Sequence, residues 1–112
     1  MKEISYKIKN NTIAIDFDGV IHKYSKGWRG LYNAYDPPND GAIESIKKLK
    51  ERGYRLVIFS SRPVEPINKW LEKYELESYF DEVTNTKTPA RVYIDDKAYH
   101  FESWKKTMED LF

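Results

Sequence analysis

The chain has 112 residues, which is enough for one small domain with a single core. Its 15% of aromatic and 33% of charged residues fit a soluble globular protein with a compact core rather than a disordered one. A formal net charge of +1 gives no strong field for steering toward nucleic acid, and the absence of cysteine excludes disulfides and cysteine-bound zinc. Residues 1–11 lack the apolar segment of a signal peptide, and no apolar run is long enough to span a membrane. We expect one cytoplasmic, monomeric domain over residues 1–112.

The first half of the chain predicts two strands and a helix. Residues 3–10 alternate apolar and polar side chains, which is typical of a short strand, and residues 12–17 ("TIAIDF") predict a buried one. Residues 41–53 place apolar side chains at helical spacing and end at Gly53, a natural helix C-cap. We therefore expect a strand and an amphipathic helix that are joined by an insert at about 22–40.

The second half repeats this alternation. Residues 54–63 ("YRLVIFSSRP") contain a continuous apolar run of the kind found in strands that are covered on both faces. Residues 65–80 predict a helix, 91–96 a third buried strand and 101–112 a final helix. Because right-handed crossovers place helices on both sides of a parallel sheet, we predict a three-layer α/β/α, Rossmann-like domain with a mainly parallel sheet.

Polar side chains gather where these strands end, and ligands bind at that edge of such sheets. The residues concerned are Asp16, Asp18, Ser60, Ser61, Asp95 and Asp96, with Lys87 shortly before the last strand. Each of these features alone is common in turns and helix caps, but their coincidence at three successive strand ends favours one shared site.

The four carboxylates indicate a metal ion. Asp16 and Asp18 are two apart on an extended segment, so their side chains point the same way. Four carboxylates in a small cleft repel one another, and a hard divalent cation removes that conflict. Oxygen ligands without histidine or cysteine favour Mg²⁺, while the hydroxyl of Ser60 and the ammonium of Lys87 suit a phosphoryl group.

Four ordered motifs, "DFDGVI", "FSSR", "NTKTP" and "VYIDD", resemble those of the haloacid dehalogenase (HAD) superfamily of aspartate-nucleophile phosphatases. The segments "DGVIHKYSKGWRG", "DPPNDGAIE" and "VTNTKTPARVYIDDKAYHFESW" are similar to small HAD proteins of bacteria and phages that have no cap domain. One departure is that Thr88 separates Lys87 from Pro89, where the family often has proline directly after the lysine.

The resemblance implies a role for each motif residue. Asp16 would be the nucleophile that forms an aspartyl-phosphate, and Asp18 the acid and base, with its backbone carbonyl on the metal. Ser60, with Ser61 beside it, and Lys87 would bind the phosphoryl oxygens. Asp96 would bind Mg²⁺ directly and Asp95 directly or through water, which makes Asp16, Asp18, Asp95 and Asp96 the metal set.

The insert at about 22–40 mixes four aromatic rings with lysine and arginine, and its length suits a loop or flap rather than a cap. Such a surface can stack a base and hold phosphates, which favours a nucleotide or nucleic-acid end as substrate, or it simply packs over the core. Arg62 either reaches a substrate phosphate or pairs with Glu65. His22 and His100 have no partner at ligand spacing, and we assign them no chemistry.

Two other functions fit part of this pattern. A phosphoaspartate receiver domain also uses an acidic cluster, a lysine and Mg²⁺, but its adjacent acidic pair follows the first strand, whereas here the pair follows the lysine. A non-catalytic module could keep the pocket and bind a nucleotide or nucleic acid through the insert. The favoured prediction is an Mg²⁺-dependent phosphomonoester hydrolase that acts on a phosphorylated small molecule or nucleotide.

Overall fold

The computed structural model describes residues 11–86, 90–95 and 99–112. The strand predicted at residues 3–10, and two of the site residues, Lys87 and Asp96, lie outside these ranges.

Five strands form one sheet in the order β3-β2-β1-β4-β5, and every pair of neighbours is parallel. The strands are β1 (Thr12–Asp16), β2 (Arg55–Phe59), β3 (Glu82–Thr84), β4 (Val92–Asp95) and β5 (Tyr99–His100). The residue patterns predicted β1, β2 and β4. Strands β3 and β5 were not predicted, because segments of three and two residues are too short to show a periodic pattern.

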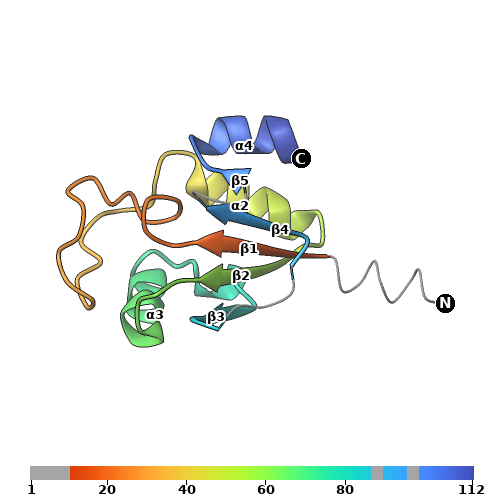
Figure 1. The fold of residues 1–112 in the computed structure, drawn as a ribbon. Coiled ribbons are helices and arrows are strands. Elements are labelled where there is room, and N and C mark those ends of the chain that lie inside the picture. The colour runs from red at the N-terminus through yellow and green to blue at the C-terminus, as the bar shows by residue number, and fades with distance from the viewer. Residues whose placement is uncertain (1–10, 87–89, 96–98) are drawn as a thin grey trace.

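Three α-helices pack against this sheet: α2 (Ala42–Glu51), α3 (Val64–Lys73) and α4 (Trp104–Leu111). Helix α2 contacts β2 and α4, and α3 contacts β3. Figure 1 shows α4 beside β5 and α3 near β2 and β3. Helix α3 is shorter than the predicted helix over 65–80. It ends where Glu75 adopts a left-handed φ of 58°, and a separate 3₁₀ turn, η1 (Glu77–Tyr79), follows.

One apolar core holds the helices against the strands. Ile13 and Ile15 of β1 lie in it with Ile46 of α2, Ile67 of α3 and Trp104 of α4, all of them at most 1% exposed. Burial of each such side chain stabilises the fold by about 1.5–3 kcal/mol. A Rossmann-like α/β domain around a parallel sheet is thus confirmed, and the described residues contain no cap domain.

The insert is a loop whose two ends are joined. His22 and Pro38 form an antiparallel bridge, and the backbone N–H of Asn39 donates to the carbonyl of Ile21 at 2.8 Å. In Figure 1 this loop extends beyond the carboxyl ends of the strands. It therefore lies at the edge of the sheet where the predicted site residues gather.

Candidate active site

Three strand ends bring polar residues together at the carboxyl edge of the sheet. Asp16 is the last residue of β1 and pairs with Phe59 of β2, so Ser60 follows directly beside it. On the other side Ile15 pairs with Ile94, and one further step along this register places Asp95 level with Asp16. The parallel pairing therefore explains why residues distant in sequence share one site.

An open cavity of about 170 Å³ lies at this edge. Three of the four predicted carboxylates line it, Asp16, Asp18 and Asp95, and Phe101 contributes an aromatic wall. Phe101 was not predicted as a site residue, because a phenylalanine at the start of a predicted helix carries no signal of a site. The structure thus brings together three residues of the predicted acidic cluster, Asp16, Asp18 and Asp95.

A tight turn follows β1, and Asp18 lies within it. The carbonyl of Phe17 accepts hydrogen bonds from the N–H groups of Val20, Ile21 and His22, and Gly19 adopts a φ of 82°. A side chain at position 19 would be strained in this left-handed conformation. The side chain of Asp16, one residue before the turn, accepts the Phe17 N–H at 2.8 Å through Oδ1.

Asp18 is held by two side chains. His22 Nδ1 lies 2.8 Å from Asp18 Oδ1, and Arg62 Nε donates to Asp18 Oδ2 at 2.8 Å. Burial of Asp18 opposes its ionisation, but the hydrogen bonds from His22 and Arg62 outweigh that effect and hold its pKa below the ordinary value. In the free protein Asp18 is therefore an ionised carboxylate in a fixed orientation, which is the form required of a base.

His22 is fully buried and bonded through both ring nitrogens. Its Nε2 accepts the backbone N–H of Asp36 at 3.0 Å, so the proton resides on Nδ1 and is donated to Asp18. The ring also stacks on Phe17, with centroids 5.2 Å apart. The sequence showed no partner for His22 at ligand spacing, and its hydrogen bond to Asp18 was not predicted. The spacing of four residues from Asp18 was visible, but only the turn after β1 makes it a contact.

Arg62 connects Asp18 to the insert. It is fully buried, and its Nη1 donates to the carbonyls of Gly30 and Leu31 at 2.7 and 2.8 Å. The guanidinium lies 4.8 Å from the ring centroid of Trp28, and Nη2 has no hydrogen-bond partner among the described residues. The alternative pairing with Glu65 is wrong, because Glu65 pairs with Lys69 at 3.2 Å. A phosphate-binding role for Arg62 stays a prediction.

The two serines differ in their surroundings. Ser60 is 4% exposed, and its Oγ accepts the backbone N–H of Arg62 at 3.2 Å, whereas Ser61 is exposed. Accepting that bond leaves the hydroxyl proton of Ser60 available to donate. Neither serine lines the acidic cavity, so their assignment to phosphate binding stays a prediction, as does that of Lys87, which the structure does not describe.

The donor chemistry of the cavity suits Mg²⁺. Within the described ranges no group of three or more acidic, histidine or cysteine side chains is arranged to hold a metal ion. Mg²⁺ nevertheless needs only one or two protein carboxylates, because it keeps several waters and takes a substrate phosphate. Asp16 and Asp95 can supply these. Since both carboxylate oxygens of Asp18 accept hydrogen bonds, that residue would contribute its backbone carbonyl, in line with the expectation from sequence.

A model of haloacid dehalogenase-like hydrolases matches residues 23–102, which is well over half of the chain. The protein therefore belongs to the haloacid dehalogenase-like hydrolase family, whose members generally use Mg²⁺. The matched range begins after Asp16 and Asp18, so the roles of these two residues depend on the cavity and the first motif.

A solved structure of a conserved protein from Bacteroides thetaiotaomicron is similar to this chain, with a TM-score of 0.66. It is 24% identical, and the alignment covers 88% of this chain and 86% of that one, which shows the fold alone. No curated protein matches the sequence. Within the described ranges, none of the helices has the length and apolar character needed to cross a bilayer.

Proposed function

We propose that the protein is an Mg²⁺-dependent phosphomonoesterase, a single domain over residues 1–112, that works through an aspartyl-phosphate on Asp16. The observation that carries this proposal is the acidic cavity at the carboxyl edge of the sheet, where Asp16, Asp18 and Asp95 meet and Asp18 is held by His22 and Arg62. Membership of a hydrolase family supports the reaction type.

In the first half-reaction the Asp16 carboxylate attacks phosphorus, and the bond between phosphorus and the ester oxygen breaks. The leaving oxygen takes a proton from Asp18. Because Asp18 is ionised in the free protein, it must gain this proton when the substrate binds, and the nearby negative phosphate favours that uptake. His22 and Arg62 keep the carboxyl group oriented throughout this step.

In the second half-reaction Asp18, which is ionised after giving its proton to the leaving oxygen, takes a proton from water. The resulting hydroxide attacks phosphorus, the bond to Asp16 breaks, and inorganic phosphate leaves. Mg²⁺, when bound by Asp16, Asp95 and the Asp18 carbonyl, would offset the negative charge of the phosphoryl group. Ser60 and Lys87 would contact the phosphoryl oxygens.

The test is a phosphatase panel with Mg²⁺ that compares an aryl phosphate, sugar phosphates and nucleoside monophosphates. We expect hydrolysis of at least one class, and a fall of about 10³-fold or more in kcat for Asp16→Asn, since this change removes the nucleophile and keeps its shape. Asp40→Asn is the matched control, because Asp40 is exposed and lies outside the cavity.

Three outcomes would contradict the proposal. Hydrolysis by Asp16→Asn at the wild-type rate would remove the nucleophile assignment. A phosphoaspartate that forms and persists would favour a receiver-like domain. Tight binding of a nucleotide or oligonucleotide without turnover of any phosphomonoester would favour a non-catalytic binding module.

A further inference from the structure

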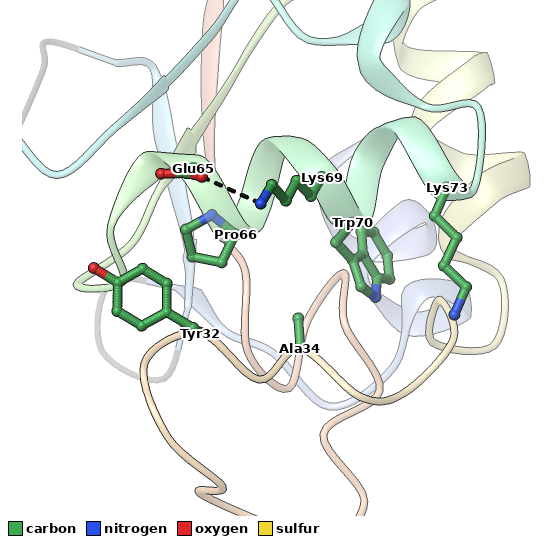
Figure 2. A pocket seen from close by; sticks show the side chains of 7 residues that line it. All are labelled: Tyr32, Ala34, Glu65, Pro66, Lys69, Trp70 and Lys73. Carbon is green, nitrogen blue, oxygen red and sulfur yellow. Dashed lines mark ion pairs between the residues drawn. The ribbon is translucent and has the colours of Figure 1, made fainter.

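A second cavity, of about 230 Å³, lies between the insert and helix α3. The residues that define its chemistry are Tyr32 from the insert and Glu65, Pro66, Lys69, Trp70 and Lys73 from α3. Figure 2 shows Tyr32 beside Pro66 at one end of this cavity and Lys73 at the other. None of these residues has a role in the reaction described above.

The walls offer flat, unsaturated surfaces. Trp70 is 3% exposed and fixed, because its Nε1 donates to the carbonyl of Asp36 at 2.7 Å. Tyr32 is 71% exposed and stands on the insert next to Leu31, which is also exposed. A large ring left in water beside a fixed indole is a surface on which another ring can stack, at a low cost in side-chain entropy.

The rim of this cavity is positively charged. Lys69 and Lys73 are four residues apart and therefore lie on the same face of α3. Glu65 pairs with Lys69, but both side chains are at least 70% exposed, so solvent weakens their attraction. The ammonium of Lys73 lies 5.4 Å from the ring centroid of Tyr74. Two ammonium groups against one carboxylate leave a surplus of positive charge that suits an anion.

Arg62 forms hydrogen bonds beside both cavities. The guanidinium binds Asp18 with Nε and the carbonyl of Leu31 with Nη1, and Tyr32 is the next residue of the insert. Pro66, which lines the second cavity, lies in the first turn of α3, four residues after Arg62. Both cavities are therefore linked to one buried side chain.

We propose that the second cavity binds the leaving group of the substrate, and that this group carries an unsaturated ring and a further negative charge. Its volume suits one ring system, stacked against Tyr32, with the second charge beside Lys69 and Lys73. The chemistry is that of a nucleotide with two phosphates, which occurs either as a free nucleoside 3′,5′-bisphosphate or as the phosphorylated end of a single strand. The inference deepens the proposed function and depends on it.

The first measurement is the ratio of kcat/KM for a nucleoside 3′,5′-bisphosphate to kcat/KM for glycerol phosphate, which has no ring. We expect Tyr32→Ala to lower this ratio about 10-fold, mainly through KM, and Tyr32→Phe to preserve it, since stacking needs the ring and not the hydroxyl. Lys73→Gln should lower kcat/KM, taken relative to that for glycerol phosphate, more for the bisphosphate than for a nucleoside monophosphate. Lys105→Gln, on the exposed side of α4, is the charge control.

Oligonucleotides with a terminal phosphate distinguish the two sources. If kcat/KM for the oligonucleotide is at least 10-fold higher than for the bisphosphate, the substrate is a nucleic-acid end. If the order is reversed, the substrate is a free nucleotide. Ratios that do not change in Tyr32→Ala and Lys73→Gln, while phosphomonoesters are still hydrolysed, would overturn the inference and leave the proposed function intact.

Equilibrium binding distinguishes a failure of the proposed function from a failure of the proposed binding site. We expect the nucleoside bisphosphate to bind Asp16→Asn protein about 10-fold more weakly when Tyr32→Ala is added, because the ring contact is lost without any turnover. If the wild-type protein hydrolyses no phosphomonoester, the proposed function fails and the leaving-group assignment fails with it. An equal affinity in the two proteins would overturn the binding site itself.

Discussion

Asp18 illustrates how strongly the surroundings of one residue can define its chemistry. A partly buried aspartate is costly unless its oxygens are paired. Here the two oxygens are bonded to His22 and Arg62, neither of which is exposed. This arrangement stabilises the ionised form and fixes the direction of the carboxylate. A base held in this way does not have to be reoriented before it takes a proton.

His22 gives the first prediction. His22→Ala should lower the free energy of unfolding by about 3 kcal/mol, because it leaves a cavity and removes the partner of the partly buried Asp36 N–H. The measurement is urea unfolding followed by circular dichroism. His100→Ala is the matched control, since the side chain of His100 is exposed and its loss should change the stability by less than about 0.5 kcal/mol.

A loss of less than about 0.5 kcal/mol in His22→Ala would contradict the structural role of this ring. His22→Asn adds a second readout. The asparagine amide can take the place of Nδ1 and donate to Asp18, so this variant should retain more activity than His22→Ala.

Among the elements, β2 and α2 are tied together by Asp81, which lies just before β3. Its Oδ2 accepts the ammonium of Lys50 at 2.6 Å and the backbone N–H of Leu56 at 2.9 Å. Burial opposes the ionisation of Asp81, but these two bonds outweigh it and hold the pKa below the ordinary value of 3.8. The charged form is therefore favoured by folding.

This shift predicts how stability depends on pH. Because the folded-state pKa of Asp81 is lowered, its contribution is fully present above pH 3.8 and is lost as the pH falls through the lower folded-state value. Asp81→Asn should be less stable than the wild type by about 1 kcal/mol or less at pH 7, since Asp81 is 31% exposed. The difference should shrink toward zero in urea unfolding below that pH. A difference that grows in acid would contradict the assignment.

The insert has little regular secondary structure, but hydrogen bonds hold it in a defined conformation. Tyr35 donates its hydroxyl proton to the carbonyl of Gly27 at 2.6 Å, and Asp36 accepts the N–H and hydroxyl of Ser25. Arg62 then binds the insert at Gly30 and Leu31. These bonds place Tyr32 and Trp28 at the edge of the sheet, where a substrate would arrive.

For the molecule as a whole, we expect Mg²⁺ to stabilise the folded state. A metal bound by Asp16 and Asp95 binds the folded chain only, so Mg²⁺ at about 100 times its dissociation constant should raise the free energy of unfolding by about 2.7 kcal/mol. The measurement is urea unfolding with Mg²⁺ and with EDTA. Asp95→Asn should lose most of the increase.

The control for this measurement is Glu109→Gln, which removes an exposed carboxylate on α4 and should leave the increase unchanged. An identical stability with Mg²⁺ and with EDTA would contradict the proposed metal site.

Much of the fold was predictable because it depends on local patterns. Each of β1, β2 and β4 shows a run of apolar residues, and α2 shows helical spacing that stops before a glycine. The end of α3 was not predictable in this way. The apolar pattern continues past Lys73, but Glu75 adopts a left-handed conformation and Leu76 turns into the core at 1% exposure. Burial of Leu76 outweighs the local preference for helix.

The acidic cluster was predictable for the same reason, because parallel strands bring their carboxyl ends to one edge wherever they pair. Asp16, Asp18 and Asp95 could therefore be grouped from their order in the chain. The hydrogen bonds from His22 and Arg62 to Asp18, and the cavity beside Tyr32, could not be predicted in this way. Arg62 lies 44 positions after Asp18 and 31 after Leu31, and a contact over such distances depends on how the insert folds back over the sheet rather than on any spacing in the sequence.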